Sequence, residues 1–278
     1  MIEAELDAAG VTRPDLVIGA WAAPTILGHG TEAQRERFVP ATLRGEINWC
    51  QLFSEPGAGS DLASCVRRPS APREAGCCQD SKVWTSRARE ADWGICLARS
   101  DASAEKHRGI TYYLVDMASD GIDIRPLREI TGDAMFTTLA NERVAMSGGS
   151  SLGEGVERLL SLTEEAGTAA DPAVLERLGT LVVVGLAVSL LDLRATLRRL
   201  EGRGPDAESS VHKLLGVWHR QAAAEAAVEL GGPDNVADGG TGELIHEFLL
   251  TRCLSIAGGT TQIRLTPAAE SILGLPRR

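Results

Sequence analysis

The sequence predicts an α+β protein with a helical N-terminal segment, a small antiparallel β-domain and a C-terminal antiparallel helical bundle. Apolar residues recur at helical spacing near the start of the chain. The pattern then changes to short runs rich in β-branched and aromatic residues, and longer helical patterns follow. We expect the three parts to span residues 1–47, 48–137 and 138–278.

The N-terminal segment carries apolar residues at roughly helical spacing: Ile2, Leu6, Leu16, Ile18, Trp21 and Leu27. Gly30 then predicts a stop, and Thr31 predicts the N-cap of a second helix. Because Gln34 follows three residues after Thr31, a capping box is expected there. The second helix is predicted to be short and amphipathic, over residues 34–43.

The middle segment predicts β-strands. Residues 94–99 and 109–116 are short runs rich in strand-forming side chains, and residues 121–127 alternate strictly between apolar and polar positions. Turn residues separate these runs, which favours antiparallel pairing.

The C-terminal segment predicts a bundle of helices joined by short links. Asp171 and Pro172 predict an N-cap followed by proline at the first helical position, opening a long helix to about Gly202. A second helix is expected over residues 207–230 and a third over 243–254. Thr266 and Pro267 are expected to cap a last short helix. The faces expected to point inward are Leu175, Leu178, Val182, Leu186 and Leu190 in the long helix, and Val211, Leu214, Leu215 and Trp218 in the second.

Composition excludes some classes of function. The 28 basic and 38 acidic residues give a net charge of −10, which argues against nucleic acid as the main partner. The six cysteines form no Cys-x-x-Cys pair, and the five histidines have no metal-ligand spacing. The first residues do not resemble a signal peptide, and Asp192 and Arg194 interrupt the apolar stretch 178–193. We therefore expect a soluble, cytoplasmic protein with reduced thiols, no metal and no membrane span.

Several short motifs follow one another in a recognisable order. They are QLFSEPGAGSDLA at residues 51–63, KVWTS at 82–86, RGITYYLV at 108–115, IRPL at 124–127, and GGTTQIR at 258–264 with ILGLPR at 272–277. This series resembles the acyl-CoA dehydrogenase family. The resemblance implies an acyl-CoA dehydrogenase-like fold, in which 82–86 is a strand, and a flavoprotein oxidoreductase of fatty acid metabolism that uses FAD and forms oligomers.

The resemblance also implies the flavin site. A glycine-rich turn lets a backbone approach a flat ring and its pyrophosphate, hydroxyls can bond the polar edge of the flavin, and an indole can pack on its face. The implied FAD contacts are Gln51, Ser54, Trp84, Ser86, Thr260 and Gln262, and Ser60 is expected to face the CoA part of the substrate. The same residues also fit simpler interpretations: a turn between strands for 54–60, a core aromatic for Trp84, and a helix stop for Gly231 and Gly232, which resemble a flavin contact across a subunit interface.

Dehydrogenation requires a base for the α-proton of the acyl thioester. Many family members carry this glutamate just before the closing Gly-Thr, where this chain has Gly258. Residues 139–149 resemble the helix that carries the base in isovaleryl-CoA dehydrogenase, so Glu142 is the implied base, with its pKa raised beside the flavin. Alternatively, Glu142 is an exposed helix carboxylate paired with Arg143.

The chain also departs from the family pattern. Its first residues are similar to the end of the family's N-terminal helical domain, so 1–47 is expected to be a remnant. Residues 65–80 have no strand pattern where relatives place a hairpin, and 132–139 lack a strand.

The expected function is α,β-dehydrogenation of an acyl-CoA with electrons passing to an electron-transfer flavoprotein or similar acceptor, in a homo-oligomer or a hetero-oligomer with a related subunit. The alternatives are a catalytically degenerate remnant, a non-catalytic partner subunit, and an oxygen-using acyl-CoA oxidase.

Overall fold

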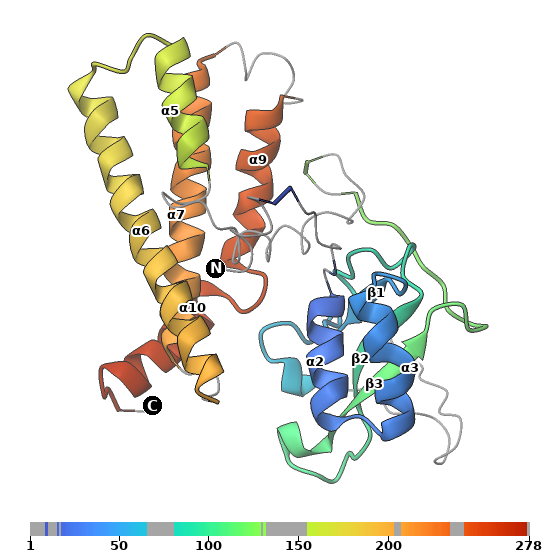
Figure 1. Ribbon diagram of the computed structural model, residues 1–278. Helices are drawn as coiled ribbons and strands as arrows, with labels where there is room; N and C mark the ends of the chain where they lie inside the picture. Colours follow the sequence, from blue (N-terminus) through green and yellow to red (C-terminus); the bar gives the residue numbers. More distant parts are fainter. Residues whose placement is uncertain are drawn as a thin grey trace. The chain divides into compact units, whose positions relative to one another are not determined.

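The computed structural model describes two compact units, residues 1–140 and 141–278 (Figure 1). The described residues are 9–10, 16, 18–65, 81–128, 130–131, 155–202, 207–233 and 242–276.

The first unit begins with two helices, α2 (Gly19–His29) and α3 (Glu32–Leu43). The predicted capping box between them is confirmed. The Gln34 amide N–H donates to the Thr31 hydroxyl at 3.3 Å, and the Thr31 N–H donates to the Gln34 side chain at 2.9 Å. These two bonds satisfy N–H groups that the first turn of a helix leaves free.

A three-stranded sheet follows, with the order β1 (Trp49–Leu52), β2 (Trp93–Arg99) and β3 (Ile110–Asp116). β2 and β3 pair antiparallel as predicted, but β1 and β2 are parallel, so the expectation of a purely antiparallel domain was wrong. Forty residues separate β1 from β2, which is long enough for the crossover that parallel pairing needs.

Two further strand predictions were wrong. Residues 121–127 form no strand, although they alternate. Residues 82–86 are not a strand either. The Val83 N–H in this segment donates to the carbonyl of Ser54, in the turn after β1, at 2.9 Å. Alternation specifies a strand only where a neighbouring strand is available for pairing.

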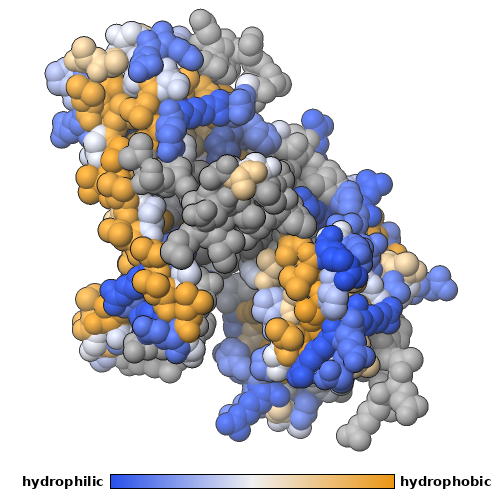
Figure 2. Space-filling model, in the orientation of Figure 1, coloured by the Kyte–Doolittle hydropathy of each residue, from blue (hydrophilic) through white to orange (hydrophobic). Residues whose placement is uncertain are grey.

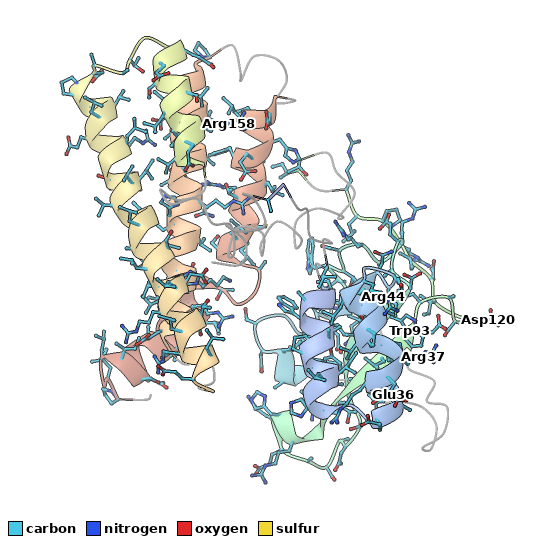
Figure 3. The ribbon with its side chains drawn as sticks, viewed as in Figure 1. Glu36, Arg37, Arg44, Trp93, Asp120 and Arg158 are labelled. Carbon is cyan, nitrogen blue, oxygen red and sulfur yellow. The ribbon has the colours of Figure 1, made fainter. Side chains whose placement is uncertain are left out.

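One hydrophobic core joins the helices to the sheet. Its buried residues are Ile18, Ala22, Ile26, Phe38, Trp49 and Ile95. The Phe38 ring lies edge-on to Trp49 and Trp93, with centroids 5.7 and 4.7 Å apart. Arg37 covers the outer side of this cluster, its guanidinium 4.8 Å from the Trp93 ring centre (Figure 3). Trp21 and Leu27, which belong to the helical pattern of the sequence, are exposed, because α2 packs through Ala22 and Ile26.

The second unit is helical (Figure 1). Its elements are α5 (Val156–Glu165), α6 (Pro172–Leu200), α7 (Glu208–Gly231), α9 (Glu243–Thr251), η3 (Arg252–Ser255), α10 (Thr261–Pro267) and η4 (Ala268–Ile272). The predicted start of α6 is confirmed, since the Asp171 carboxylate accepts the Ala173 N–H at 2.8 Å. The last helix begins after Thr260 rather than Thr266, because the Thr260 hydroxyl caps the Ile263 N–H at 3.2 Å.

The core of the second unit uses only part of the predicted apolar faces. Leu178 and Leu181 of α6 are buried against α5 and α7, together with alanines of α7. Leu175, Leu186 and Leu190, expected to point inward, are exposed, and so is Trp218. Figure 2 shows the hydrophobic band that runs along α6. α6 also continues through Asp192 and Arg194. The stretch Pro172–Arg198 is long and apolar enough to cross a membrane by length and composition alone, and 17% of its most apolar part is buried.

His219 provides a pH test of this core. Burial lowers the pKa of His219 below its ordinary 6.5, although its ring nitrogen lies 3.1 Å from the Leu181 carbonyl. Below pH 6.5 the unfolded chain takes up a proton that the folded chain does not, so stability is lost as pH falls towards the lowered pKa. We expect the midpoint temperature of thermal unfolding to decrease when the pH is lowered from 7.5 to 5.5. This fall should be smaller in His219→Gln, which keeps a donor but does not titrate. An equal fall in both proteins would contradict this prediction.

Candidate active site

The glycine-rich segment after β1 forms a closed turn. The Glu55 N–H donates to the Ala58 carbonyl at 3.0 Å, and the Ala58 N–H donates back to the Glu55 carbonyl at 3.1 Å. At Gly57 and Gly59 an added Cβ would meet no atom within 4 Å. The outer face of the turn therefore has room for a close approach by another group at these two glycines.

A buried ion pair lies under this turn. Lys82 Nζ donates to Glu55 Oε1 at 2.9 Å and to the carbonyls of Leu97 at 2.8 Å and Phe53 at 3.3 Å. The side chains of Lys82 and Glu55 are 7% and 8% exposed. Lys82 thus fixes the turn to β2, and its neighbour Val83 bonds Ser54. Lys82 lies in the motif 82–86, but its position in the sequence gives no sign of this role.

Trp84, Thr85 and Ser86 follow Lys82 directly. Trp84 has a φ of 59°, rare for a bulky residue, and its side chain is 62% exposed. Ser86 is 2% exposed, and the buried Thr85 hydroxyl has no hydrogen-bond partner among the described residues. An exposed aromatic face beside an unpaired buried hydroxyl fits a flat ring with a polar edge. The interpretation of Trp84 as a core aromatic is wrong.

The remaining predicted residues of this unit lie nearby in the chain. Gln51 in β1 and Ser54 after it are half-buried, whereas Ser60 is exposed. Beside Ser60, the Ser64 hydroxyl donates to Asp61 and lowers the pKa of that carboxyl. Lys106 lies 3.8 Å from Asp61 and lowers this pKa further.

The closing motif forms a turn held by two cations. Gly258 and Gly259 have φ values of 62° and 98°, which favour glycine. Lys213 Nζ donates to the carbonyls of Ala257 and Gly259, the latter at 2.6 Å, and Arg264 Nε donates to the Gly258 carbonyl at 3.2 Å. Lys213 is 8% exposed. These contacts fix the backbone that leads into half-buried Thr260 and exposed Gln262.

The predicted site residues are divided between the two units. Gln51, Ser54, Ser60, Trp84 and Ser86 belong to the first unit. Thr260 and Gln262 belong to the second. Glu142 lies outside the described residues, so its role as the base stays a prediction. Gly232 ends α7 with a φ of 74°.

Lys213→Met should loosen the closing turn. It removes a buried cationic donor from two carbonyls, and losing hydrogen bonds to a charged group typically costs about 1.5–3 kcal/mol. We expect a lower free energy of unfolding in urea. Lys213→Arg, which keeps the charge and the donors, should restore part of the lost stability. Wild-type behaviour of Lys213→Met would show that the turn does not depend on this contact.

A separate cavity of about 350 Å³ lies between α5, α7 and α9. Two ion pairs line it, Arg158–Glu243 at 2.9 Å (Arg158 is labelled in Figure 3) and Arg220–Glu247 at 3.0 Å. It contains none of the predicted site residues. Within the described residues, no group of three or more His, Cys, Asp or Glu side chains could hold a metal ion.

Comparison with protein families gives two matches that together span most of the chain. Residues 50–140 match the model of the acyl-CoA dehydrogenase middle domain, and residues 132–273 match that of the acyl-CoA dehydrogenase C-terminal domain. Over all of its length the chain is 52% identical to acyl-CoA dehydrogenase FadE34 of Mycobacterium tuberculosis, but it spans 42% of that protein. It is 34% identical to acyl-CoA dehydrogenase IpdE1 of the same organism, with 91% of the chain and 74% of that protein covered.

Solved structures share the fold. The Tcur3481-Tcur3483 steroid ACAD has a TM-score of 0.82 at 22% identity, covering 99% of this chain and 80% of that one. The ChsE4-ChsE5 complex from Mycobacterium tuberculosis has a TM-score of 0.73 at 22% identity, with 99% and 81% covered. A glutaryl-CoA dehydrogenase from Mycobacterium smegmatis in complex with FADH2 has a TM-score of 0.75 at 18% identity, with 92% and 73% covered.

Proposed function

Because this chain belongs to the acyl-CoA dehydrogenase family, we propose that it binds FAD and catalyses α,β-dehydrogenation of an acyl-CoA thioester. The observation that carries this proposal is the open turn 54–61 beside Trp84, together with the buried Thr85 hydroxyl, which has no hydrogen-bond partner within the described part of the chain. The family is flavin-dependent, and this arrangement fits the flat, polar-edged ring of a flavin.

Each proposed residue has a defined task. The residues that bind FAD are Gln51, Ser54, Trp84, Ser86, Thr260 and Gln262. Ser60 faces the CoA part of the substrate, and Glu142 removes the α-proton. FAD, when bound, supplies the acceptor for the β-hydride. Lys82 and Lys213 hold the two binding turns in place through the carbonyls that they contact.

The proposed partners follow from the same family. Electrons pass to an electron-transfer flavoprotein or a similar acceptor. The chain works as an oligomer, either with copies of itself or with a related subunit, and the ChsE4-ChsE5 neighbour is a complex of that second kind by its name. The proposed setting is the cytoplasm.

Purification tests this proposal directly. The protein should be yellow, or should turn yellow with added FAD, and the flavin band should bleach anaerobically when an acyl-CoA is added. A colourless protein that ignores FAD would overturn the proposal in favour of a remnant or a non-catalytic subunit. If the protein binds flavin but no acyl-CoA bleaches the flavin band, the proposed cofactor stands and the proposed reaction is wrong.

A further inference from the structure

The exposure of Trp84 and Ser86 does not match a single binding face. Trp84 is 62% exposed, whereas Ser86 is 2% exposed. In an extended chain the side chains of residues 84 and 86 point to the same face, because successive side chains alternate. A flavin ring that lies on Trp84 cannot reach the hydroxyl of Ser86 while Ser86 stays buried. In this conformation the segment provides one of the two contacts proposed for it.

The backbone of the same segment is strained. Trp84 and Arg87 have φ values of 59° and 58°, in the left-handed region that residues with a side chain disfavour. The penalty at one such residue lowers the population of the conformation by roughly fivefold to thirtyfold. Val83, Trp84 and Thr85 are of types that favour extended strands. The buried Thr85 hydroxyl also has no hydrogen-bond partner among the residues that the structure describes.

Contacts on both sides of the segment confine any change to it. On one side, Lys82 donates to Glu55 at 2.9 Å under the glycine-rich turn. On the other side, the Asp92 N–H donates to the Asn48 carbonyl at 2.9 Å, and the Asp92 carboxylate accepts the Asn48 N–H at 2.8 Å. Residues 84–87 lie between these two anchors, so their backbone can change conformation while β1 and β2 stay in place.

We propose that FAD binding turns residues 84–87 from the left-handed into an extended conformation, which brings the Trp84 and Ser86 side chains onto one face. Without the cofactor, the turn that the Glu90 N–H closes on the Arg87 carbonyl at 3.2 Å holds the left-handed form. The change relieves the two positive φ angles and frees the Thr85 hydroxyl from its unpaired site. It rests on the proposed function, because FAD shifts this balance only by binding the extended form more tightly.

The proposal makes FAD affinity depend on Arg87, a residue that has no proposed contact with the cofactor. If only the extended form binds, the apparent dissociation constant rises in proportion as the left-handed form is favoured. Glycine adopts a positive φ without strain, whereas alanine does not. Arg87→Gly and Arg87→Ala lose the same guanidinium group, so the two variants differ in their tolerance of the φ of 58°.

Fluorescence titration of these two variants with FAD tests the change. Arg87→Gly should bind FAD roughly fivefold to thirtyfold more weakly than Arg87→Ala, although it should be the more stable of the two in urea without FAD. A purely structural role would not move affinity and stability in opposite directions. Arg89→Gly and Arg89→Ala are the matched control pair. Arg89 is exposed in the same turn and has no positive φ, so both of its variants should bind FAD equally.

Two outcomes would overturn the proposal. If the Arg87 variants bind FAD equally, or if Arg87→Gly binds it more tightly, the segment does not turn, and the proposed function stands. If the wild type binds no FAD, the proposed function itself is wrong, and this inference fails with it. Should Arg87→Ala not fold, Arg87→Gly is compared with the wild type, whose arginine disfavours the same φ, and the same weakening is required.

Discussion

Lys82→Met should lower the free energy of unfolding of the first unit, and it should do so by more than the other single substitutions proposed for this chain. The substitution leaves the Glu55 carboxylate, 8% exposed, without the cation 2.9 Å away. It also removes the donor to the Phe53 and Leu97 carbonyls. Removing one partner of a buried ion pair typically costs about 3–5 kcal/mol, because the remaining buried charge has lost its counter-ion.

Tryptophan fluorescence in urea is the appropriate measurement, since four of the five tryptophans lie in the first unit. The double variant Lys82→Met/Glu55→Gln removes both charges and should recover a large part of the loss. Lys106→Met breaks the exposed contact with Asp61 and should change little. A Lys82→Met protein as stable as the wild type would show that this pair does not hold the turn.

Glu142→Gln should abolish most of the acyl-CoA-dependent bleaching of the flavin while leaving FAD bound. The amide has nearly the shape of the carboxylate but cannot accept the α-proton. Loss of a general base typically lowers the rate on the order of 10²–10⁴-fold. The measurement is the anaerobic rate of flavin bleaching in a stopped-flow instrument, at saturating acyl-CoA.

Glu165→Gln is a matched control for this test. Glu165 is an exposed carboxylate at the end of α5, and its amide variant should bleach at the wild-type rate. Full activity of Glu142→Gln would remove Glu142 from the reaction. Loss of flavin from the variant would instead indicate a structural role for this residue.

The sequence alone specified the features that depend only on residues close together in the chain. Thr31 and Gln34 are three residues apart and form a capping box wherever a helix starts there. Asp171 before Pro172 likewise marks the start of α6. The motifs at 54–61, 82–86 and 258–264 were sufficient for the family, because each is contiguous in the chain.

The tertiary structure decided which surfaces meet. Lys82 bonds Glu55 across 27 residues, and Lys213 bonds the closing turn across 44 and 46 residues. No local spacing encodes these contacts, so the roles of both lysines were missed. The direction of β1 was also undetermined, since a forty-residue connection allows either pairing.

The long helix α6 shows this difference most clearly. The sequence determined that α6 forms and that it is apolar, because helix formation depends on residues within a few positions of one another. It predicted that Leu178 would be buried, but it did not determine that Leu181 would be buried and Leu186 and Leu190 exposed. That choice depends on where α5 and α7 pack, and an apolar residue has the same sequence signal whether or not a neighbouring helix covers it.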